Sequence, residues 1–334
     1  MNDNVVKNKE SDVIAHKSDF LLERISSKKN RKQLERALKF SIKMHHGQVR
    51  KSGLPFVSHC IDVANKLLDW NMDQITIISA LLHDVVEDTE VTLEDIDKEF
   101  GSEVAMLVDG VTKVDNIAFR STEHKQAENF IKLFLSLAND LRVIIIKFAD
   151  RLNNMETIQF LSSKKRKIIA LETKEIFVPL AHRLGMAKVK WELEDLSLKC
   201  LDLRSYNSIK KKIETSAKLN EDILSNAIQP IKTELNSYKI KSNIFGRYKS
   251  ISSIHRKINN RGKKFEEIYD LYAIRIVVDK IEECYLALGV IHNIYPPIQE
   301  RFKDFIATPK TNGYQSIHTT VLTKDNRLTE VQIR

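Results

Sequence analysis

Histidine and acidic residues are concentrated at residues 83–88, which read His-Asp-Val-Val-Glu-Asp. On a helix, residues four apart share a face, so His83 would lie beside Glu87 and Asp84 beside Asp88. Carboxylates this close repel one another unless a cation lies between them, and a divalent metal accepts imidazole nitrogen and carboxylate oxygen as ligands. The motif therefore indicates a metal site, although a solvated acidic helix end is the more frequent explanation of so short a pattern.

Two residues far from this motif could complete such a site. His59 precedes an apolar helix at residues 61–68, and Asp150 follows the apolar run at residues 143–146. Two leucines precede His83 in the same way, so each of these ionisable groups adjoins a hydrophobic core, where it needs a partner. This placement strengthens the metal interpretation but leaves ordinary surface charge open as an alternative.

The second half of the chain carries a different chemistry. Residues 246–257 contain several Arg and Lys side chains that could contact triphosphate oxygens, on a loop followed by a helix. Glu330 lies on an alternating segment, which puts Val331 and Ile333 on the core face and Glu330 on the opposite face. If adjacent strands bring Asp270 close to Glu330, the two carboxylates could hold Mg²⁺ for phosphoryl transfer.

The net charge of +9 is unevenly distributed. Residues 240–334 carry sixteen Lys and Arg against ten Asp and Glu, whereas the preceding residues are nearly balanced. Such an excess favours a phosphate-rich ligand, either nucleotide or nucleic acid, although a solvated basic face explains the charge alone equally well. Aromatic residues are few and no RNA-recognition pattern is present, which argues against a basic RNA-binding protein.

The overall composition excludes several other classes of protein. With 334 residues, 42% hydrophobic and 30% charged, the chain should form about two folded domains. No stretch approaches the ~18 apolar residues of a membrane span, and the first eighteen residues lack the apolar core of a signal peptide. The three cysteines are far apart and odd in number, so we expect no disulfide framework and a reducing, cytoplasmic location.

The first half of the chain should be nearly all helical, because its apolar residues recur at helical spacing. Asn139 or Asp140 is a suitable N-cap for one of these helices, and residues 193–237 form a charged, helical connecting segment. The expected helices before this segment are residues 30–69 with a loop at 46–55, then 75–86, 93–100, 104–111, 122–137, 143–157 and 165–184.

The pattern changes after Tyr238 to a mixture of helix and strand. Residues 271–279 form a β-branched run typical of a buried strand, and residues 317–322 and 328–333 read as a hairpin. Residues 284–295 should form an amphipathic helix between them. The second half is therefore expected to be an α+β domain that begins near residue 240.

Several long motifs occur in the order found in RelA/SpoT homologues, which make and degrade the guanosine alarmone (p)ppGpp. The His59, His83-Asp84 and Asp150 set resembles the signature of HD-type phosphohydrolases. The matching segments are 46–53, 81–89, 108–113 and 149–155 for the hydrolase domain, and 268–275, 301–320 and 330–334 for the synthetase domain. The resemblance implies a mainly α HD-type hydrolase domain over residues 1–195, a helical connector over 196–240, and an α+β, nucleotidyltransferase-like synthetase domain with a mixed sheet over 241–334.

For the first domain, the resemblance implies hydrolysis of the 3′-pyrophosphate of (p)ppGpp. Glu87 and Asp88 would orient the attacking water or take its proton, while the metal lowers the pKa of that water. A single Mn²⁺ would be held by His59, His83, Asp84 and Asp150. The substrate would be bound by Arg50, Lys51, Asn154 and Thr157. Cys60 and Asn153 replace a proline and a histidine that are usual in the family, but neither is a ligand position.

For the second domain, the resemblance implies transfer of pyrophosphate from ATP to the 3′-hydroxyl of GDP or GTP. Asp270 and Glu330 would hold Mg²⁺. ATP would be bound by Arg247, Lys249, Lys257 and Arg275. The guanine nucleotide would be bound by Lys303, Lys310, Asn312, Tyr314, Gln315 and His318.

Relatives continue beyond the position of Arg334 with a closing helix and regulatory domains. We therefore expect an incomplete synthetase domain and no regulatory C-terminal domains in this chain. The basic segment 301–304 goes with bifunctional members of the family. A hydrolase whose second half only binds nucleotide and regulates is the principal alternative.

Overall fold

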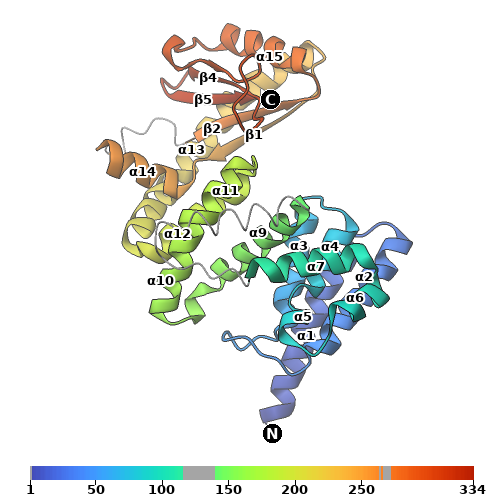
Figure 1. Ribbon diagram of the computed structural model, residues 1–334. Coiled ribbons are helices and arrows are strands. Elements are labelled where there is room, and N and C mark those ends of the chain that lie inside the picture. Colours follow the sequence, from blue (N-terminus) through green and yellow to red (C-terminus); the bar gives the residue numbers. More distant parts are fainter. Residues whose placement is uncertain (1, 116–139, 263–264, 266–271) are drawn as a thin grey trace. The chain divides into compact units, whose positions relative to one another are not determined.

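A computed structural model describes residues 2–115, 140–262, 265 and 272–334 of the chain (Figure 1). The chain divides into two compact units, Met1–Glu172 and Thr173–Arg334, which are considered separately below. The expected helix at residues 122–137, with Asn139 and Asp270, lies outside the described residues. Within the described ranges, no helix has the length and apolarity needed to cross a membrane.

The first unit is helical throughout its described part. Its largest fully buried side chains come from several helices and include Leu34, Ile61, Leu81 and Phe148, which form the core. The helices are α1 (Asn2–Glu23), α2 (Lys28–Met44), α3 (Val57–Asp69), α4 (Gln74–Leu82), α5 (Val85–Asp88), α6 (Leu93–Phe100), α7 (Ser102–Asp115), α9 (Leu141–Glu156), the 3₁₀ turn η1 (Ile158–Phe160) and α10 (Ser163–Glu172).

Side-chain caps begin several of these helices. Asp73 accepts a hydrogen bond from the Thr76 amide at the start of α4, and Asp140 accepts one from the Arg142 amide at the start of α9. Each cap satisfies one of the amides that the first turn of a helix leaves without a partner. Asp140 is therefore the cap of α9, one of the two residues expected from the sequence.

Two expected helices are interrupted. The segment 75–86 is not continuous, because α4 ends at Leu82 and α5 begins at Val85. At this break the His83 ring bonds to the Ala80 carbonyl, a local side-chain contact that competes with the helical pattern. The segment 165–184 is likewise divided into α10, the π-helix η2 (Thr173–Phe177) and α11 (Val178–Arg183), whose first turn contains a proline without an amide donor.

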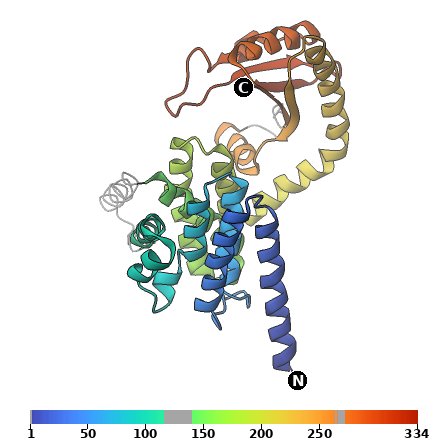
Figure 2. The same ribbon diagram turned by 90° about the vertical axis from the view of Figure 1, so that its right-hand side faces the viewer.

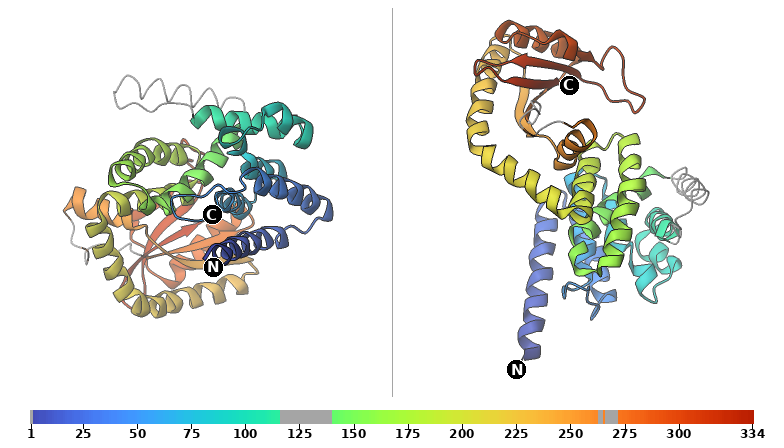
Figure 3. Two further views of the ribbon diagram at one scale, coloured as in Figure 1. Left: turned by 90° about the horizontal axis from the view of Figure 1, so that it is seen from below. Right: turned by 90° about the vertical axis from the view of Figure 1, so that its left-hand side faces the viewer.

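The second unit combines helices with one mixed sheet, so the expected fold class is confirmed. After η2 and α11 come two connecting helices, of which α13 contains Pro230 and is curved along its length (Figure 3). The remaining elements are α12 (Ala187–Leu201), α13 (Leu203–Ser237), β1 (Ser242–Tyr248), α14 (Ile251–Arg261), β2 (Tyr272–Val278), α15 (Ile281–Ile294), η4 (Gln299–Arg301), β3 (Lys303–Asp304), β4 (Ile317–Leu322) and β5 (Leu328–Ile333).

The five strands lie in the order β1-β2-β5-β4-β3. The β2 and β5 strands are parallel, with Ala273 opposite Glu330 and Arg275 opposite Gln332. The other neighbours are antiparallel, and β4 places His318 opposite Gln332. This register brings polar residues from three strands onto one face of the sheet.

The opposite face of the sheet is covered by helices. The end of α13 and the inner side of α15 pack against it (Figure 2), and the shared core includes Ile231, Ile274, Ile291, Val331 and Ile333. The predicted alternation on β5 is confirmed, because Val331 and Ile333 are buried while Glu330 and Gln332 are only half-buried.

The sequence predicted most of these strands but not all of them. The hairpin strands β4 and β5 have the expected bounds, while β2 and α15 differ from expectation by a few residues at their ends. The strand β1 was not expected, since its last residues, from Gly246 on, were assigned to a loop leading into a helix. Its polar composition, with Ser242, Asn243 and Arg247, hides the strand pattern.

A close approach between β1 and α13 requires glycine at position 246. A Cβ atom there would lie 1.8 Å from Cδ2 and 2.9 Å from Cγ of Leu224. Rotating the end of the leucine does not relieve both contacts, so we expect Gly246→Ala to cost about 1–3 kcal/mol of folding free energy, as overpacking does. Calorimetry should show a lower Tm for the transition of the second unit.

Gly289→Ala is the matched control for this substitution. Gly289 lies inside α15, and nothing lies within 4 Å of an added Cβ. Alanine is the better helix former by about 1 kcal/mol, so this variant should be as stable as the parent or more so. Equal losses of Tm in the two variants would contradict the steric explanation.

Candidate functional site

Four of the predicted ligand residues meet in the first unit. His59 lies on α3, His83 and Asp84 lie between α4 and α5, and Asp150 lies on α9. Nε2 of His59 is 3.2 Å from Oδ1 of Asp150 and 3.6 Å from Oδ2 of Asp84, and Nε2 of His83 is 3.1 Å from Oδ1 of Asp84. Three segments distant in sequence therefore bring two imidazoles and two carboxylates together.

Both imidazoles turn the same nitrogen into this cluster. Nδ1 of His59 donates to Oδ1 of Asn153 at 2.6 Å, and Nδ1 of His83 donates to the Ala80 carbonyl at 2.8 Å. When the imidazoles are neutral, these bonds keep the proton on Nδ1 and leave each Nε2 with the lone pair that a metal requires. Nε2 of His83 is buried and forms no hydrogen bond within the described residues. This donor set fits a divalent cation.

The charges in the cluster are balanced only by cationic neighbours. Burial alone would raise the pKa of Asp150, but Lys147, whose Nζ lies 2.7 Å from Oδ2, and His59 hold that pKa well below its usual range. Burial alone would lower the pKa of His59, but the hydrogen bond with Asp150 and the charge of Asp84 raise it overall. Asp150 therefore stays ionised, as a carboxylate that binds a metal must be.

Among the described residues, the ligand atoms fall into two overlapping groups that could hold a metal ion. One consists of His59, His83 and Asp150, and the other of Cys60, His83 and Asp84. Burial and the charge of Asp84 raise the pKa of the Cys60 thiol well above its usual value. Since a thiol must lose its proton to become a metal ligand, the imidazoles and carboxylates are the stronger donor set.

Glu87 and Asp88 lie on the short helix α5 directly after these ligands. Both residues are exposed overall, but partial burial of the Asp88 carboxylate, together with the charge of Asp84, raises the pKa of Asp88. A raised pKa makes a carboxylate a stronger base. Gln48 donates to the backbone carbonyl of Asp88 at 2.8 Å, which ties the loop after α2 to this turn.

The predicted substrate residues fall into two groups. Arg50 donates to Oδ1 of Asn154 at 2.7 Å and to Oδ1 of Asn153 at 3.2 Å, so the loop after α2 is joined to α9 beside the cluster. The Thr157 hydroxyl donates to the Asn153 carbonyl at the end of α9. Lys51 is an exposed side chain on the same loop as Arg50.

The sequence missed two supporting residues. Lys147 precedes Asp150 by three residues and forms an ion pair with it inside an apolar run. Asn153 was recognised only as a departure from a histidine, whereas in the structure its Oδ1 accepts a hydrogen bond from Nδ1 of His59. Its position one turn before Thr157 and next to Asn154 is the one signal that could have indicated this role.

Loss of the Asn153 acceptor should weaken metal binding. In Asn153→Ala the His59 ring loses the bond that fixes its orientation, and loss of such a supporting bond costs about 10–100-fold in metal affinity. A Mn²⁺ titration followed by electron paramagnetic resonance measures this directly. Gln159→Ala, an exposed change just after the same helix, should bind Mn²⁺ as the parent does. Equal affinities in all three proteins would contradict the role of Asn153.

A second polar cluster lies on the open face of the sheet in the second unit. Arg275 donates to Oε1 of Gln332 at 3.3 Å, and the Gln332 amide donates to Oε1 of Glu330 at 3.0 Å. His318 approaches the same Glu330 oxygen, with Nδ1 at 3.3 Å. Burial alone would raise the pKa of Glu330, but hydrogen bonds from His318 and Gln332 lower it to about 2.

Tyr314 extends this cluster into the loop before β4. Because Nδ1 of His318 donates to Glu330, its Nε2 accepts the hydroxyl proton of Tyr314 at 2.8 Å. The Lys310 ammonium lies 4.4 Å from the Phe305 ring centre and 5.0 Å from that of Tyr314. An aromatic surface beside a cation and a carboxylate can bind a base and its phosphates.

The remaining predicted nucleotide residues are less closely joined to this cluster. Asn312 donates to the His182 carbonyl and accepts from the Tyr314 amide, which shapes the loop. Lys249 precedes α14 and its charge contributes to lowering the pKa of Glu330, while Lys257 is half-buried on α14. Lys303 and Gln315 are exposed. Asp270 and the side chain of Arg247 lie outside the described part.

The chain matches two family models, and the matched regions follow the same order as the two sites. A model described as HD domain matches residues 37–187, and a model described as region found in RelA / SpoT proteins matches residues 246–334. The first match contains all four clustered ligand residues of the first unit. The second contains the polar face of the sheet.

Similar proteins carry names that correspond to these two regions. The chain is 44% identical over 304 residues to a guanosine-3′,5′-bis(diphosphate) 3′-pyrophosphohydrolase of Spiroplasma citri, covering 91% of this chain and 41% of that protein. It is 44% identical over 303 residues to a GTP pyrophosphokinase of Streptomyces coelicolor, covering 91% of this chain and 36% of that protein. The chain thus spans about two fifths of the length of these curated relatives.

A solved structure is also similar to part of the chain. It is described as a metazoan ortholog of SpoT that hydrolyzes ppGpp, and it is 29% identical with a TM-score of 0.41. The likeness covers 49% of this chain and 93% of that structure.

Proposed function

The chain belongs to the RelA/SpoT family, and from that membership we propose that it is a bifunctional enzyme that both hydrolyses and synthesises (p)ppGpp. Hydrolysis is assigned to the cluster in the first unit, and synthesis to the polar sheet face in the second. The substrates are guanine nucleotides and ATP. The location that we propose is the cytoplasm, because three cysteines far apart in the sequence suit a reducing compartment.

The observation that carries the hydrolase proposal is the shared orientation of His59 and His83. Each ring uses Nδ1 in a hydrogen bond and turns Nε2 toward the carboxylates of Asp84 and Asp150. We propose that these four residues hold Mn²⁺. When bound, such an ion lowers the pKa of water and offsets negative charge on phosphate.

The protein's own residues supply the rest of the hydrolysis. Water attacks the 3′-linked phosphorus, whose bond to the ribose oxygen breaks, so pyrophosphate and a free 3′-hydroxyl are the products. Asp88 and Glu87 accept the proton of the water, and the raised pKa of Asp88 suits it to that task. Arg50, held by Asn154, contacts the phosphates with Lys51 on the same loop.

A product assay tests this proposal. The full chain is incubated with ppGpp and Mn²⁺, and the nucleotides and phosphates are separated by ion-exchange chromatography. We expect GDP and pyrophosphate in equal amounts. Release of single phosphates, or of products from the 5′ end of the nucleotide, would overturn the proposal.

The synthetase proposal is carried by the linked side chains on the open sheet face. The hydrogen-bonded series from Arg275 through Gln332, Glu330 and His318 to Tyr314 joins a cation, a carboxylate and an aromatic ring. We propose that Glu330, with Asp270, holds Mg²⁺ and that Tyr314 stacks on guanine. The cations expected to bind ATP are Arg247, Lys249, Lys257 and Arg275, and those around the guanine nucleotide are Lys303 and Lys310, with Asn312, Gln315 and His318.

In this reaction the 3′-hydroxyl of GDP or GTP attacks the β-phosphorus of ATP, and AMP leaves. Positioning and charge neutralisation account for most of the acceleration in such transfers. Incubation with ATP, GDP and Mg²⁺ tests the proposal, with ppGpp and AMP as the expected products. Nucleotide binding without turnover would instead favour a hydrolase whose second unit is only regulatory.

A further inference from the structure

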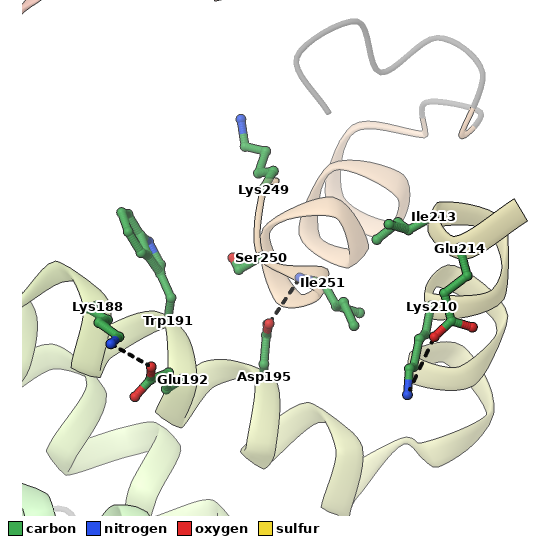
Figure 4. Close-up of a pocket in the computed structure, with 10 residues that line it drawn as sticks. All are labelled: Lys188, Trp191, Glu192, Asp195, Lys210, Ile213, Glu214, Lys249, Ser250 and Ile251. Atoms are coloured by element: carbon green, nitrogen blue, oxygen red, sulfur yellow. Dashed lines mark hydrogen bonds and ion pairs between the residues drawn. The ribbon is translucent and has the colours of Figure 1, made fainter. Parts of the chain in front are cut away.

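The helix α14 is capped by a carboxylate from another helix. Asp195 of α12 accepts hydrogen bonds from the amides of Ile251 at 3.2 Å and Ser252 at 2.7 Å (Figure 4). The side chain of the N-cap residue, Ser250, accepts from the Ser253 amide at the longer distance of 3.4 Å. The first amides of a helix lack partners within it and attract negative charge, so Asp195 is the stronger cap.

A second contact joins the same two helices one turn further on. Glu194, next to Asp195 on α12, pairs with Arg256 of α14 at 2.9 Å and with Lys190 at 3.5 Å. The Glu194 side chain is only 11% exposed, whereas that of Arg256 is 54% exposed, so water screens the pair on the arginine side. The two adjacent acidic residues therefore hold α14 at its start and along its first turns.

The turn before α14 is open on one side. A pocket of about 430 Å³ lies between α12, α13 and this turn, and its lining includes Trp191, Ile213, Lys249 and Ile251 (Figure 4). Because the turn is open on this side, the hydrogen bonds of Asp195 act together with the packing of Ile251 and Ile254 against Ile209 to hold the start of α14 in place. Moving the turn would move Lys249, which directly precedes the Ser250 cap.

Lys249 connects the turn that Asp195 holds to the sheet that carries the polar face. It directly follows Tyr248, the last residue of the sheet strand β1, and directly precedes Ser250 at the start of α14. Lys249 is also among the cations proposed above to bind ATP. A displaced Lys249 would meet the triphosphate poorly even though it remained in the protein.

We propose that Asp195, supported by Glu194, is a positioning residue of the pyrophosphate-transfer site, which fixes the turn that presents Lys249 to the triphosphate of ATP. The inference rests on the proposed synthesis of ppGpp. A residue that only orients a phosphate contact made equally in ground state and transition state affects KM rather than kcat.

The test compares Asp195→Ala and Asp195→Asn in the full chain. Loss of two bonds to a charged acceptor should raise the KM for ATP about tenfold in Asp195→Ala and leave kcat within about twofold. The asparagine keeps one acceptor oxygen, so its KM should lie between those of the parent and the alanine variant. Amide hydrogen exchange at Ile251 and Ser252 should be faster in both variants.

Glu192→Gln is the matched control, since Glu192 lies on α12 beside the same pocket and pairs with Lys188 on its own helix. It should leave the KM for ATP unchanged. An unchanged KM in Asp195→Ala despite faster exchange would overturn the inference, as would an equal rise in Glu192→Gln. A parallel loss of ppGpp hydrolysis would also overturn it, because it would indicate general unfolding.

Failure of the underlying function would be recognised separately. If the parent chain makes no ppGpp from ATP and GDP, the proposed synthesis is wrong. The affinity for ATP with Mg²⁺, measured by calorimetry, then replaces KM. Binding about tenfold weaker in Asp195→Ala would still support the positioning role, and equal binding would overturn it.

Discussion

Asp84→Ala should abolish hydrolysis of ppGpp while leaving synthesis intact. Asp84 lies within 3.1 Å of Nε2 of His83 and 3.6 Å of Nε2 of His59, so its removal leaves both imidazoles without their shared carboxylate. A metal ion supplies several kcal/mol of stabilisation in such reactions, which corresponds to about a thousandfold or more in rate. Initial rates of GDP formation in Mn²⁺ measure the loss.

The control for this variant separates a lost ligand from a lost fold. Asp97→Asn changes an exposed carboxylate on α6 and should hydrolyse ppGpp at the parental rate. Calorimetric titration should show weaker Mn²⁺ binding in Asp84→Ala, and the Tm in the presence of EDTA should stay close to that of the parent. Hydrolysis at the parental rate in Asp84→Ala would exclude the cluster as the catalytic centre.

The sequence predicted elements well where one side-chain period covers the whole element. In β5 the apolar Val331 and Ile333 alternate with Glu330 and Gln332, and both strands of the hairpin have the expected bounds. Helical spacing did not predict the break after α4. There the His83 ring bonds to the Ala80 carbonyl and competes with the backbone for it. The spacing of apolar residues also did not predict β1, because its polar residues do not alternate with apolar ones.

From the sequence, only the residue types and the motifs of the site could be predicted. The pattern at residues 83–88 indicates a metal site, but nothing in spacing alone relates it to His59 and Asp150. The resemblance to a family supplied that connection, and the structure brings these residues within 3.2–3.6 Å of one another. The bond from His59 to Asn153 depends on packing between α3 and α9, which leaves no pattern in the sequence, whereas Lys147 and Asp150 are an i,i+3 pair on α9 that the spacing could have indicated.

In the second unit, the sequence predicted the orientation of a site residue but not its partners. The alternation on β5 predicted that Glu330 points away from the core, which is correct. It did not predict that His318 and Gln332 would bind the carboxylate, because that depends on the register of β4 against β5. Register between strands is set by the turn and by packing on the covered face, not by the polar residues.

Glu330→Gln should abolish synthesis of ppGpp while hydrolysis continues at the parental rate. The carboxylate accepts from His318 and Gln332 and is the proposed Mg²⁺ ligand of the sheet face. An amide keeps the shape but loses the charge, so we expect a loss of about a hundredfold or more, as for other preorganised charges at transition states. Formation of ppGpp from ATP and GDP measures it, with Glu282→Gln, an exposed change on α15, as the control.

The low pKa of Glu330 adds a pH dependence to this prediction. Folding lowers the pKa from its usual value to about 2, so the interactions of the carboxylate stabilise the fold above the unfolded-state pKa and are lost only as pH falls toward about 2. Glu330 therefore stays ionised between pH 5 and 9 and should contribute no acid limb to the rate of synthesis over that range. A limb that is present in the parent chain and disappears in Glu330→Gln would show that the carboxylate titrates during catalysis, and it would contradict a role as a permanently ionised metal ligand.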